Sequence, residues 1–469
     1  MLQHAPLRVD IAELYVIDST LTALVPEQMT LQITALCTLL SAFTLLGNEA
    51  AALDSQAYIE KAAALIKEGE YSLARTYLAP ALIDYRLTRG ERSRAYYLRG
   101  YSYLANNLAV SAAKDYNRAL EFNPDNPAAL FALGNLHFRG IGLALDEAVA
   151  FGLFEKAAQF SHPDAQFRVG FAYLEGRGVE KNLTLARQWL ADAAAAENTA
   201  AMTYLARSYR EGFAEPPQPD LARQWYERAA TAGANDALVA LAYMHRNGEF
   251  VDVDDSEALR LFREAAAAGS GAAQVNLGHL YLTGDIVEQD LSLALDFFNQ
   301  AAEQGNPASF LSLGHLFESG TGVTQNLQTA KTWFERAARA GLTNAQLRLV
   351  YLLRREGDSA SALPWLIKAA EQDNPVAQND YAWFLATNTE DNLRNGQLAL
   401  TYAQQAVQQN PTPAYLDTLA AAHAELGEFV DAIATQERAL ALVGDTESNL
   451  GVELQSHLNA YRDGKPWRE

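Results

Sequence analysis

Small residues recur every 36 positions through the middle of the chain, and this regularity is the strongest pattern in the sequence. One column holds only glycine or alanine: Gly134, Gly170, Ala206, Ala242, Gly278 and Gly314. A second column, six residues further on, is glycine throughout: Gly140, Gly176, Gly212, Gly248, Gly284 and Gly320. Six units keep this register without an insertion, which indicates one supersecondary unit repeated in tandem.

The apolar positions inside each unit predict two helices. The stretch "AAQVNLGHLYLTG" (272–284) represents the first helix, with apolar residues three or four apart on one face: Ala273, Leu277, Leu280 and Tyr281. Gly284 is expected to end this helix, because glycine enters the left-handed conformation at little cost. The stretch "NLQTAKTWFERAARAG" (326–341) represents the second helix, opened by an asparagine cap and with these residues facing inward: Ala330, Trp333, Phe334 and Ala337.

A single hairpin of this kind cannot bury its own apolar face, so neighbouring hairpins must stack. The small-residue column lets the first helix approach the second closely. A column of mostly bulky residues is expected to fill the space beside it: Leu153, Trp189, Trp225, Leu261, Phe297 and Trp333. We therefore predict an all-α solenoid of roughly eleven hairpins, or about 22 helices.

These columns closely resemble the Sel-one-like repeat (SLR), a subfamily of the tetratricopeptide repeat (TPR). One unit alone supplies the following matches to the family pattern: Ala273, Leu277, Gly278, Tyr281, Gly284, Ala294, Phe297, Phe298, Ala301, Ala302 and Gly305. The flanks are similar to ordinary TPRs, before the array through Tyr96, Gly100, Tyr103, Ala112, Tyr116, Ala119 and Pro124, and after it through Leu416, Ala420, Gly427, Ala432 and Ala439. The resemblance implies an alpha-alpha superhelix, a right-handed solenoid of SLR and TPR hairpins.

The same patterns suggest how the chain is organised. We expect an N-terminal extension (1–52), TPRs over 53–127 and six SLR units over 128–343. Two irregular SLR- or TPR-like repeats (344–412) and a C-terminal TPR with a capping helix (413–469) follow.

An apolar run over 31–46, followed by small residues up to Ala52, has the order of a secretory signal peptide spanning 29–52. However, no lysine or arginine stands between Met29 and the run. An N-terminal helix capping the array and an uncleaved membrane anchor therefore stay open as alternatives, and the membrane is contacted only if the run is retained. The expected compartment is the periplasm, with the cytoplasm as the alternative. Cys37, the single cysteine, lies inside this run.

Charge excludes one class of partner. The chain carries a net charge of −21, and its 36 basic residues form no basic cluster. Nucleic-acid binding needs clustered lysine and arginine against the phosphates, so we expect no nucleic-acid partner.

The candidates for chemistry are few, and the spacing argues against each of them. His279 and His315 occupy the same column of consecutive units, where Asn135 and Phe171 stand elsewhere. Stacked helices lie about 10 Å apart, too far for two imidazoles to share a zinc ion without further ligands. The glycine loop "ESGTGVTQN" follows a helix and holds no basic residue, unlike a phosphate loop. We expect no catalytic residue, metal or cofactor, and read both histidines as groove-lining or solvated side chains.

The unit that departs most from the 36-residue pattern contains three aromatic residues, Tyr381, Trp383 and Phe384. An irregular aromatic patch is one form that a partner contact takes. The alternative is that these rings pack the junction between unequal repeats. With His279 and His315 they are the candidate partner-contact residues.

The functional expectation is a non-catalytic protein–protein interaction scaffold or adaptor in the bacterial cell envelope. It would hold one or more proteins or peptides on the concave face of the solenoid. A cytosolic signalling or regulatory adaptor is one alternative. An enzyme or small-molecule binder using the groove is another, and it would require titratable groups that converge and have strongly perturbed pKa values.

Overall fold

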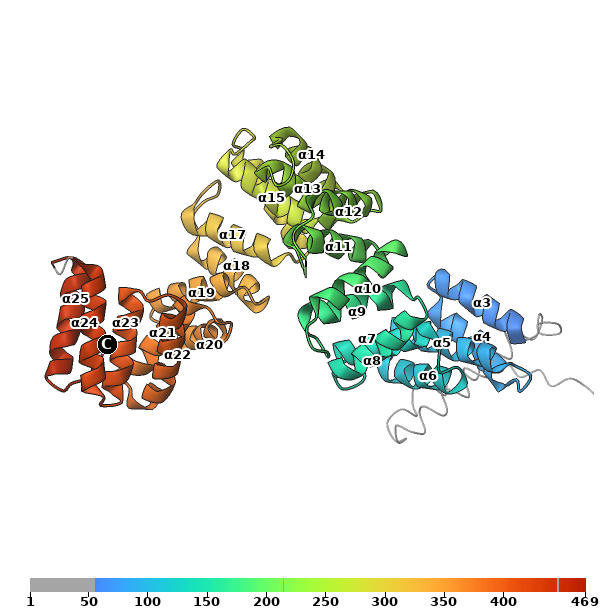
Figure 1. Ribbon diagram of the computed structural model, residues 1–469, viewed down its shortest axis with the longest axis horizontal. Coiled ribbons are helices and arrows are strands. Elements are labelled where there is room, and N and C mark those ends of the chain that lie inside the picture. The colour runs from blue at the N-terminus through green and yellow to red at the C-terminus, as the bar shows by residue number, and fades with distance from the viewer. Residues whose placement is uncertain (1–54, 214, 445–446) are drawn as a thin grey trace, which may run out of the picture. The chain divides into compact units, whose positions relative to one another are not determined.

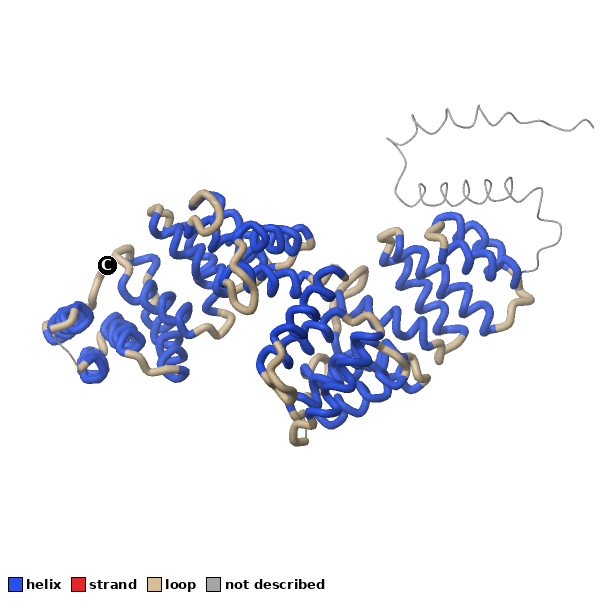
Figure 2. The backbone as a smooth tube through the Cα atoms, turned by 90° about the horizontal axis from the view of Figure 1, so that it is seen from above, coloured by secondary structure: helices blue, strands red, loops and turns tan. Residues whose placement is uncertain are grey.

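The computed structural model describes residues 55–213, 215–444 and 447–469, and these residues form helices joined by loops (Figures 1 and 2). They contain 23 α-helices, the short 3₁₀ helix η2 (Asp391–Leu393) and no strand. The all-α solenoid predicted from the sequence is confirmed. The predicted signal peptide over 29–52, the apolar run over 31–46 and Cys37 lie outside the described residues.

The chain divides into two compact units, up to Ala237 and from Leu238, and the division falls within α13 (Asn235–Asn247). In both units the odd-numbered helices are the first of each hairpin, here called A helices, and the even-numbered ones are B helices. The first unit contains α3 (Ser55–Lys67), α4 (Tyr71–Ile83), α5 (Arg89–Ala105), α6 (Ala109–Phe122), α7 (Pro127–Arg139), α8 (Glu147–Gln159), α9 (Pro163–Glu175), α10 (Leu183–Ala195), α11 (Thr199–Glu211) and α12 (Pro219–Thr231).

The second unit continues the same alternation of helices. Its helices after α13 are α14 (Asp255–Ala267), α15 (Gly271–Thr283), α16 (Leu291–Glu303), α17 (Pro307–Ser319), α18 (Leu327–Arg339), α19 (Thr343–Arg355), α20 (Ser359–Ala370), α21 (Pro375–Thr387), α22 (Gly396–Gln409), α23 (Pro413–Glu425), α24 (Phe429–Val443) and α25 (Asn449–Arg462). Among the described residues, no helix combines the length and the hydrophobicity that a bilayer span requires.

The small-residue column exists because the A helix touches an aromatic ring of its own B helix. A Cβ atom built on Gly314 would lie 2.5 Å from Cε1 of Phe334, closer than carbon atoms can pack. The ring that fills this space is Phe334, which is fully buried, and not the preceding Trp333. Trp333 instead stacks on Phe310 of α17, with ring centroids 5.8 Å apart. The bulky column expected from the sequence is therefore displaced by one residue.

The helix ends follow the chemistry expected of them. Gly320 ends α17 in the left-handed conformation (φ 78°), and its N–H donates to the Leu316 carbonyl. The B helix that follows is opened by Asn326, whose side chain accepts a hydrogen bond from the N–H of Thr329. Asparagine and aspartate caps of this kind also open α8, α10, α14 and α16. These caps fix where each helix starts and hold consecutive hairpins to one pattern.

Candidate functional site

A column of ring-bearing side chains runs over consecutive A helices of the second unit, and we call it the ring column. Each member directly follows the small-residue column or its equivalent; the members are Tyr243, His279, His315, Tyr351 and Trp383. His279 and His315 stand edge-on against Phe298 and Phe334, with centroids 5.0 and 5.1 Å apart. The packing that fixes the hairpin therefore also aims these rings at one face, here called the inner face.

Two ring-column members line an open groove between α15 and α17. The groove has a volume of about 500 Å³ and is bordered by His279, Leu282, Ala308, Leu311, Ser312, His315, Leu316, Ser319 and Thr321. Its wall is mainly apolar, with hydroxyl and imidazole groups at intervals. The sequence expectation that both histidines line a groove agrees with this placement, while their contact with a partner stays a prediction.

His279 and Ser312 form the arrangement in the groove that comes nearest to catalytic chemistry. Nε2 of His279 lies 3.2 Å from Oγ of Ser312, the spacing of a nucleophile and its base. However, the hydroxyl also donates to the Ala308 carbonyl, at 3.1 Å. Ser312 lies in the middle of α17, where the backbone N–H groups are used within the helix and cannot form an oxyanion hole. No acidic group orients His279 within the described part of the chain, so the pair lacks the rest of a hydrolytic site.

The electrostatics of the groove favour a neutral His279. The surrounding protein removes part of the ring's hydration, and this effect, more than the nearby His315, lowers the pKa of His279 below its usual value. His315 lies 3.5 Å from the Glu318 carboxylate through Nδ1. That carboxylate is also held by Arg348 of α19, at 2.6 Å. The groove therefore presents apolar surface and hydrogen-bonding groups more than a concentrated charge.

The three aromatic residues proposed from the sequence have different positions. Tyr381 is 8 % exposed, and its ring packs against Tyr402 of α22 with centroids 5.2 Å apart. Phe384 packs against the same core. Trp383 belongs to the ring column, but it also packs against this core, and its ring lies 5.5 Å from that of His457. The packing alternative thus applies to all three residues, and their contact with a partner stays a prediction.

A second site lies on α21, α23 and α25, and it is filled by residues 465–469, here called the docked segment, which lead to the end marked C in Figure 1. The Trp467 ring lies 4.4 Å from the ring of His457, whose other neighbour is Trp383 at 5.5 Å. His457 is 1 % exposed, and its Nδ1 lies 2.8 Å from the Asp417 carboxylate. Gln436 donates to the same carboxylate oxygen at 2.6 Å. The floor of the site is therefore a buried and hydrogen-bonded group.

The polar end of the docked segment is held by side chains and backbone together. Arg468 reaches the Glu425 carboxylate at 2.5 Å and donates to the Ala386 carbonyl at 3.1 Å. Glu469 donates its N–H to the Thr387 carbonyl at 3.0 Å and accepts from Nε1 of Trp383 at 2.6 Å. Two helices that lie far apart in the sequence, α21 and α25, are thereby linked through five residues.

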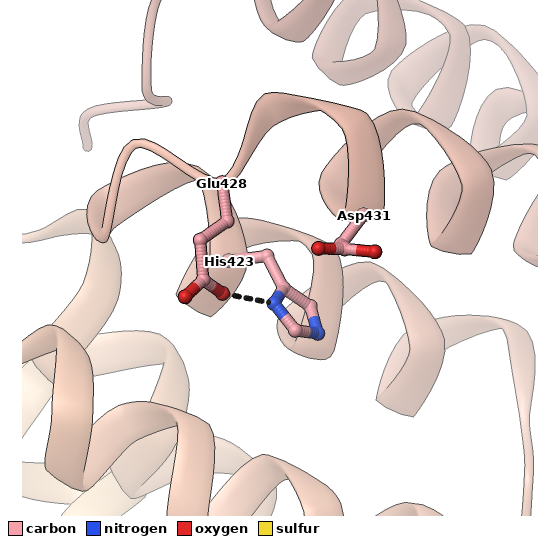
Figure 3. A group of neighbouring side chains, drawn as sticks. All are labelled: His423, Glu428 and Asp431. Atoms are coloured by element: carbon pink, nitrogen blue, oxygen red, sulfur yellow. Dashed lines mark hydrogen bonds and ion pairs between the residues drawn. The ribbon is translucent and has the colours of Figure 1, made fainter.

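One further cluster, His423, Glu428 and Asp431, places three possible metal ligands within 4.8 Å of one another (Figure 3). Nδ1 of His423 already lies 2.7 Å from a Glu428 oxygen. Glu428 and Asp431 are exposed and lie at the start of α24, where the helix dipole favours acidic groups. The ion pair and the helix end account for all three groups, and we assign no cation to them.

Sequence reasoning missed the docked segment and the His423 cluster. The sequence contained a signal for the docked segment, because "KPWRE" (465–469) places a tryptophan among charged residues. A second signal was that the glycine that ends most A helices is Asn388 in this unit. No local pattern, however, connects position 388 with position 468.

The comparisons with known proteins agree with this architecture. A model described as Sel1 repeat matches residues 127–159, 163–198, 199–233, 235–270, 271–306, 311–342 and 353–374, and a TPR repeat model matches residues 111–139. No curated protein matches the sequence.

Among solved structures, a protective antigen of uropathogenic Escherichia coli displaying an SLR fold is 25 % identical, with 90 % of each chain covered and a TM-score of 0.47. A Sel1 repeat protein from Oxalobacter formigenes is 28 % identical over 50 % of this chain and 95 % of its own, with a TM-score of 0.44. The matched repeats confirm the resemblance found in the sequence, and the chain belongs to the Sel1 repeat family.

Proposed function

We propose that the protein is a non-catalytic scaffold that holds an extended segment of a partner protein along the inner face of its second unit. Repeat folds of the Sel1 and TPR type generally serve as protein-interaction scaffolds. The observation that carries the proposal is the groove of about 500 Å³ between α15 and α17, into which His279 and His315 project. Its apolar wall and spaced hydrogen-bonding groups suit a peptide backbone with apolar side chains.

The test is photo-crosslinking from a single position of the full-length protein in cells. A photoreactive phenylalanine analogue replaces His315 in the groove, and the matched control carries it at Gln328, an exposed position on α18. We expect one discrete protein adduct from position 315 and none from position 328. Adducts of equal yield from both positions, or from position 328 alone, would contradict binding at the inner face.

The catalytic alternative is tested separately through Ser312. A scaffold keeps its crosslinked partner when Ser312 is replaced by alanine, because the apolar wall remains. An enzyme using the Ser312–His279 pair would instead lose turnover of a co-purifying small molecule. Recovery of a metabolite that the wild-type protein converts and the Ser312→Ala variant does not would overturn the scaffold proposal.

We further propose that the scaffold acts in the bacterial cell envelope, as a periplasmic adaptor. The support is the apolar run over 31–46 with the small residues that follow it. N-terminal sequencing of protein from cell fractions tests the compartment. A start near Leu53 in the periplasmic fraction is expected, and an intact Met1 in the cytosol would favour the cytosolic adaptor instead.

A further inference from the structure

The docked segment meets its site through groups that differ in chemistry. Trp467 supplies an aromatic face against His457, Arg468 supplies a cation to Glu425, and the backbone of Glu469 supplies an N–H to Thr387. The first two contacts depend on the type of side chain in the segment. The third is a backbone hydrogen bond that any residue except proline could donate. Recognition of an extended peptide can combine main-chain hydrogen bonds with specific side-chain contacts in the same way.

The end of α21 explains why this site accepts a segment of chain. Both helices satisfy two carbonyls of their last turn locally: Gly320 and Asn326 donate to Leu316 and Phe317 in α17, and Asn388 and Asn395 donate to Phe384 and Leu385 in α21. The helices differ one residue later: the Glu318 carbonyl accepts from Nε2 of Gln325 in the same hairpin, at 2.9 Å, whereas the Ala386 and Thr387 carbonyls accept from Arg468 and Glu469. Unsatisfied carbonyls at a helix end attract a donor, preferably a cationic one.

The site itself does not depend on the docked segment. Asp417 is held by Gln436 and His457, and Glu425 is also bound by Arg394 at 2.9 Å. These partners come from the surrounding helices and from the turn that precedes α22. With the docked segment removed, the carboxylate of Glu425, the ring of His457 and the two carbonyls of α21 would still be in place to receive a ligand.

The connection between α25 and the docked segment is short and exposed. Asp463, Gly464 and Lys465 are solvent-exposed, and Gly464 has a φ of +69°, which a glycine adopts without strain. The Lys465 side chain reaches only Asp463, at 3.7 Å. The N–H groups of Gly464 and Lys465 cap α25, donating to the Tyr461 and Ala460 carbonyls at 3.0 and 2.9 Å. Trp467, Arg468 and Glu469 hold the segment to its site, and they can leave by rotation of the backbone after Lys465 without breaking these caps.

We propose that residues 465–469 occupy in cis a peptide-binding site on α21, α23 and α25, and that a partner carrying an extended segment with an aromatic residue followed by arginine binds there by displacing them. This inference rests on the proposed scaffold function and adds a second, self-occupied site to the open groove. Because the occupant is covalently attached, it competes at a high effective concentration. A partner must therefore match its chemistry or be presented at high local concentration.

The test measures binding of a fluorescein-labelled peptide with the sequence of residues 464–469, by fluorescence anisotropy. Three proteins are compared: the intact chain, a variant that ends at Gly464, and the full-length double variant Trp467→Ala, Arg468→Ala. We expect the two variants to bind the peptide on the order of 10- to 100-fold more tightly than the intact chain, which is the penalty of a site that is mostly occupied. The double variant covers the case in which the shortened chain folds poorly.

The control peptide carries alanine in place of tryptophan and arginine, and it should bind neither variant. If the variants fold, as judged by circular dichroism and thermal melting, and still fail to bind the original peptide, the site is a structural cap and the proposal is wrong. Equal binding by all three proteins would place the peptide elsewhere and also overturn it. A dimer of the intact chain that disappears in both variants would assign the site to exchange between two copies, and would contradict a separate partner.

Failure of this proposal is distinguishable from failure of the scaffold function. The crosslink from position 315 lies on α17 and needs no displacement of the docked segment. Loss of peptide binding with that crosslink intact removes the second site alone. Loss of the crosslink with peptide binding intact removes the groove alone.

Discussion

The open groove of α17 and the filled site of α21 lie at corresponding places on two A helices of the second unit. His315 and Trp383 follow the equivalent small residues Gly314 and Ala382, and both belong to the ring column. At the end of one helix the Glu318 carbonyl accepts from Gln325 of the same hairpin, whereas at the end of the other the Ala386 carbonyl accepts from Arg468 of the docked segment. The comparison indicates that the residues at the helix end, and not the ring-column residue, determine whether each site is open or filled.

The largest expected difference between the two sites is in the stability lost when a hydrogen-bonding residue is removed, Asp417 in the filled site or Ser312 in the open groove. Replacing Asp417 by alanine leaves the Gln436 amide and the His457 ring buried without their shared acceptor, and should lower the free energy of unfolding by roughly 3 kcal/mol. Replacing Ser312 by alanine in the open groove removes a hydroxyl that contacts the exposed His279 and the Ala308 carbonyl, and should cost about 0.5 kcal/mol or less. Urea denaturation of both variants measures the difference.

Asp417→Asn serves as the control, since it keeps an oxygen that can accept from Gln436. It should retain part of the lost stability. If the alanine variants at positions 417 and 312 lose equal free energy of unfolding, the two sites depend equally on these hydrogen-bonding residues and the prediction is wrong.

The next prediction concerns the small residue that precedes each ring-column residue, Gly314 in α17 and Ala382 in α21. Gly314→Ala places a Cβ 2.5 Å from the Phe334 ring and should destabilise the protein by about 1–3 kcal/mol through overpacking. The reverse change on the other helix, Ala382→Gly, should cost about 0.5–1 kcal/mol through backbone freedom. Thermal melting compares the two.

A second substitution, Phe334→Leu, should rescue part of the stability lost in Gly314→Ala because it removes the ring that the new methyl group meets. If the double variant is no more stable than the single one, the strain lies elsewhere in the hairpin.

Replacing the arginine of each site should change the free energy of unfolding by amounts that differ less than in the two comparisons above. Arg468 is bonded both to Glu425 and to a carbonyl at the end of α21, so Arg468→Ala should lower the free energy of unfolding by about 0.5–1 kcal/mol. Arg348 meets the Glu318 carboxylate near the open groove and lies 4.8 Å above the exposed Tyr351 ring, and Arg348→Ala should cost about 0.5 kcal/mol or less. The urea midpoints of the two variants at low salt test this order. A larger loss of stability for Arg348→Ala than for Arg468→Ala would contradict it.

The smallest expected effect is a pH dependence of the open groove. Because the folded protein lowers the pKa of His279, the unfolded chain binds its proton more readily. The stability that this residue contributes is therefore complete above the unfolded pKa of about 6.5 and is lost as the pH falls toward the folded value. Replacing His315 by glutamine should raise the pKa of His279, as followed by NMR of the imidazole ring during titration.

His423→Gln provides the matched control, since its ring pairs with Glu428 and not with His279. An unchanged His279 titration in the His315 variant would show that His315 contributes nothing to the lowered pKa.

The repeat made most of the fold predictable, because each helix end and each close contact is encoded by a residue that recurs at a fixed spacing. Gly320, Asn326 and Gly314 could each be assigned a structural role from their columns alone. The assignment of Trp333 to the helix contact was wrong by one position, since two adjacent aromatic residues give the same periodic signal. Only the packing geometry separates Phe334 from Trp333.

The candidate sites were less predictable, for a physical reason. His279 and His315 could be placed on one face because a column fixes direction. The contact between Trp383 and Glu469 joins positions 86 residues apart and depends on how α21, α23 and α25 stack. No periodicity in the chain carries that information.

The contact between Gly314 and Phe334 lies inside a single hairpin, as does the equivalent contact between Gly278 and Phe298. For this contact, the complementary volumes are thus matched within one 36-residue unit. A gene duplication or deletion that respects this unit would transfer both partners of each contact together. The solenoid can therefore change length in evolution by whole hairpins, and each change adds or removes one ring from the inner face.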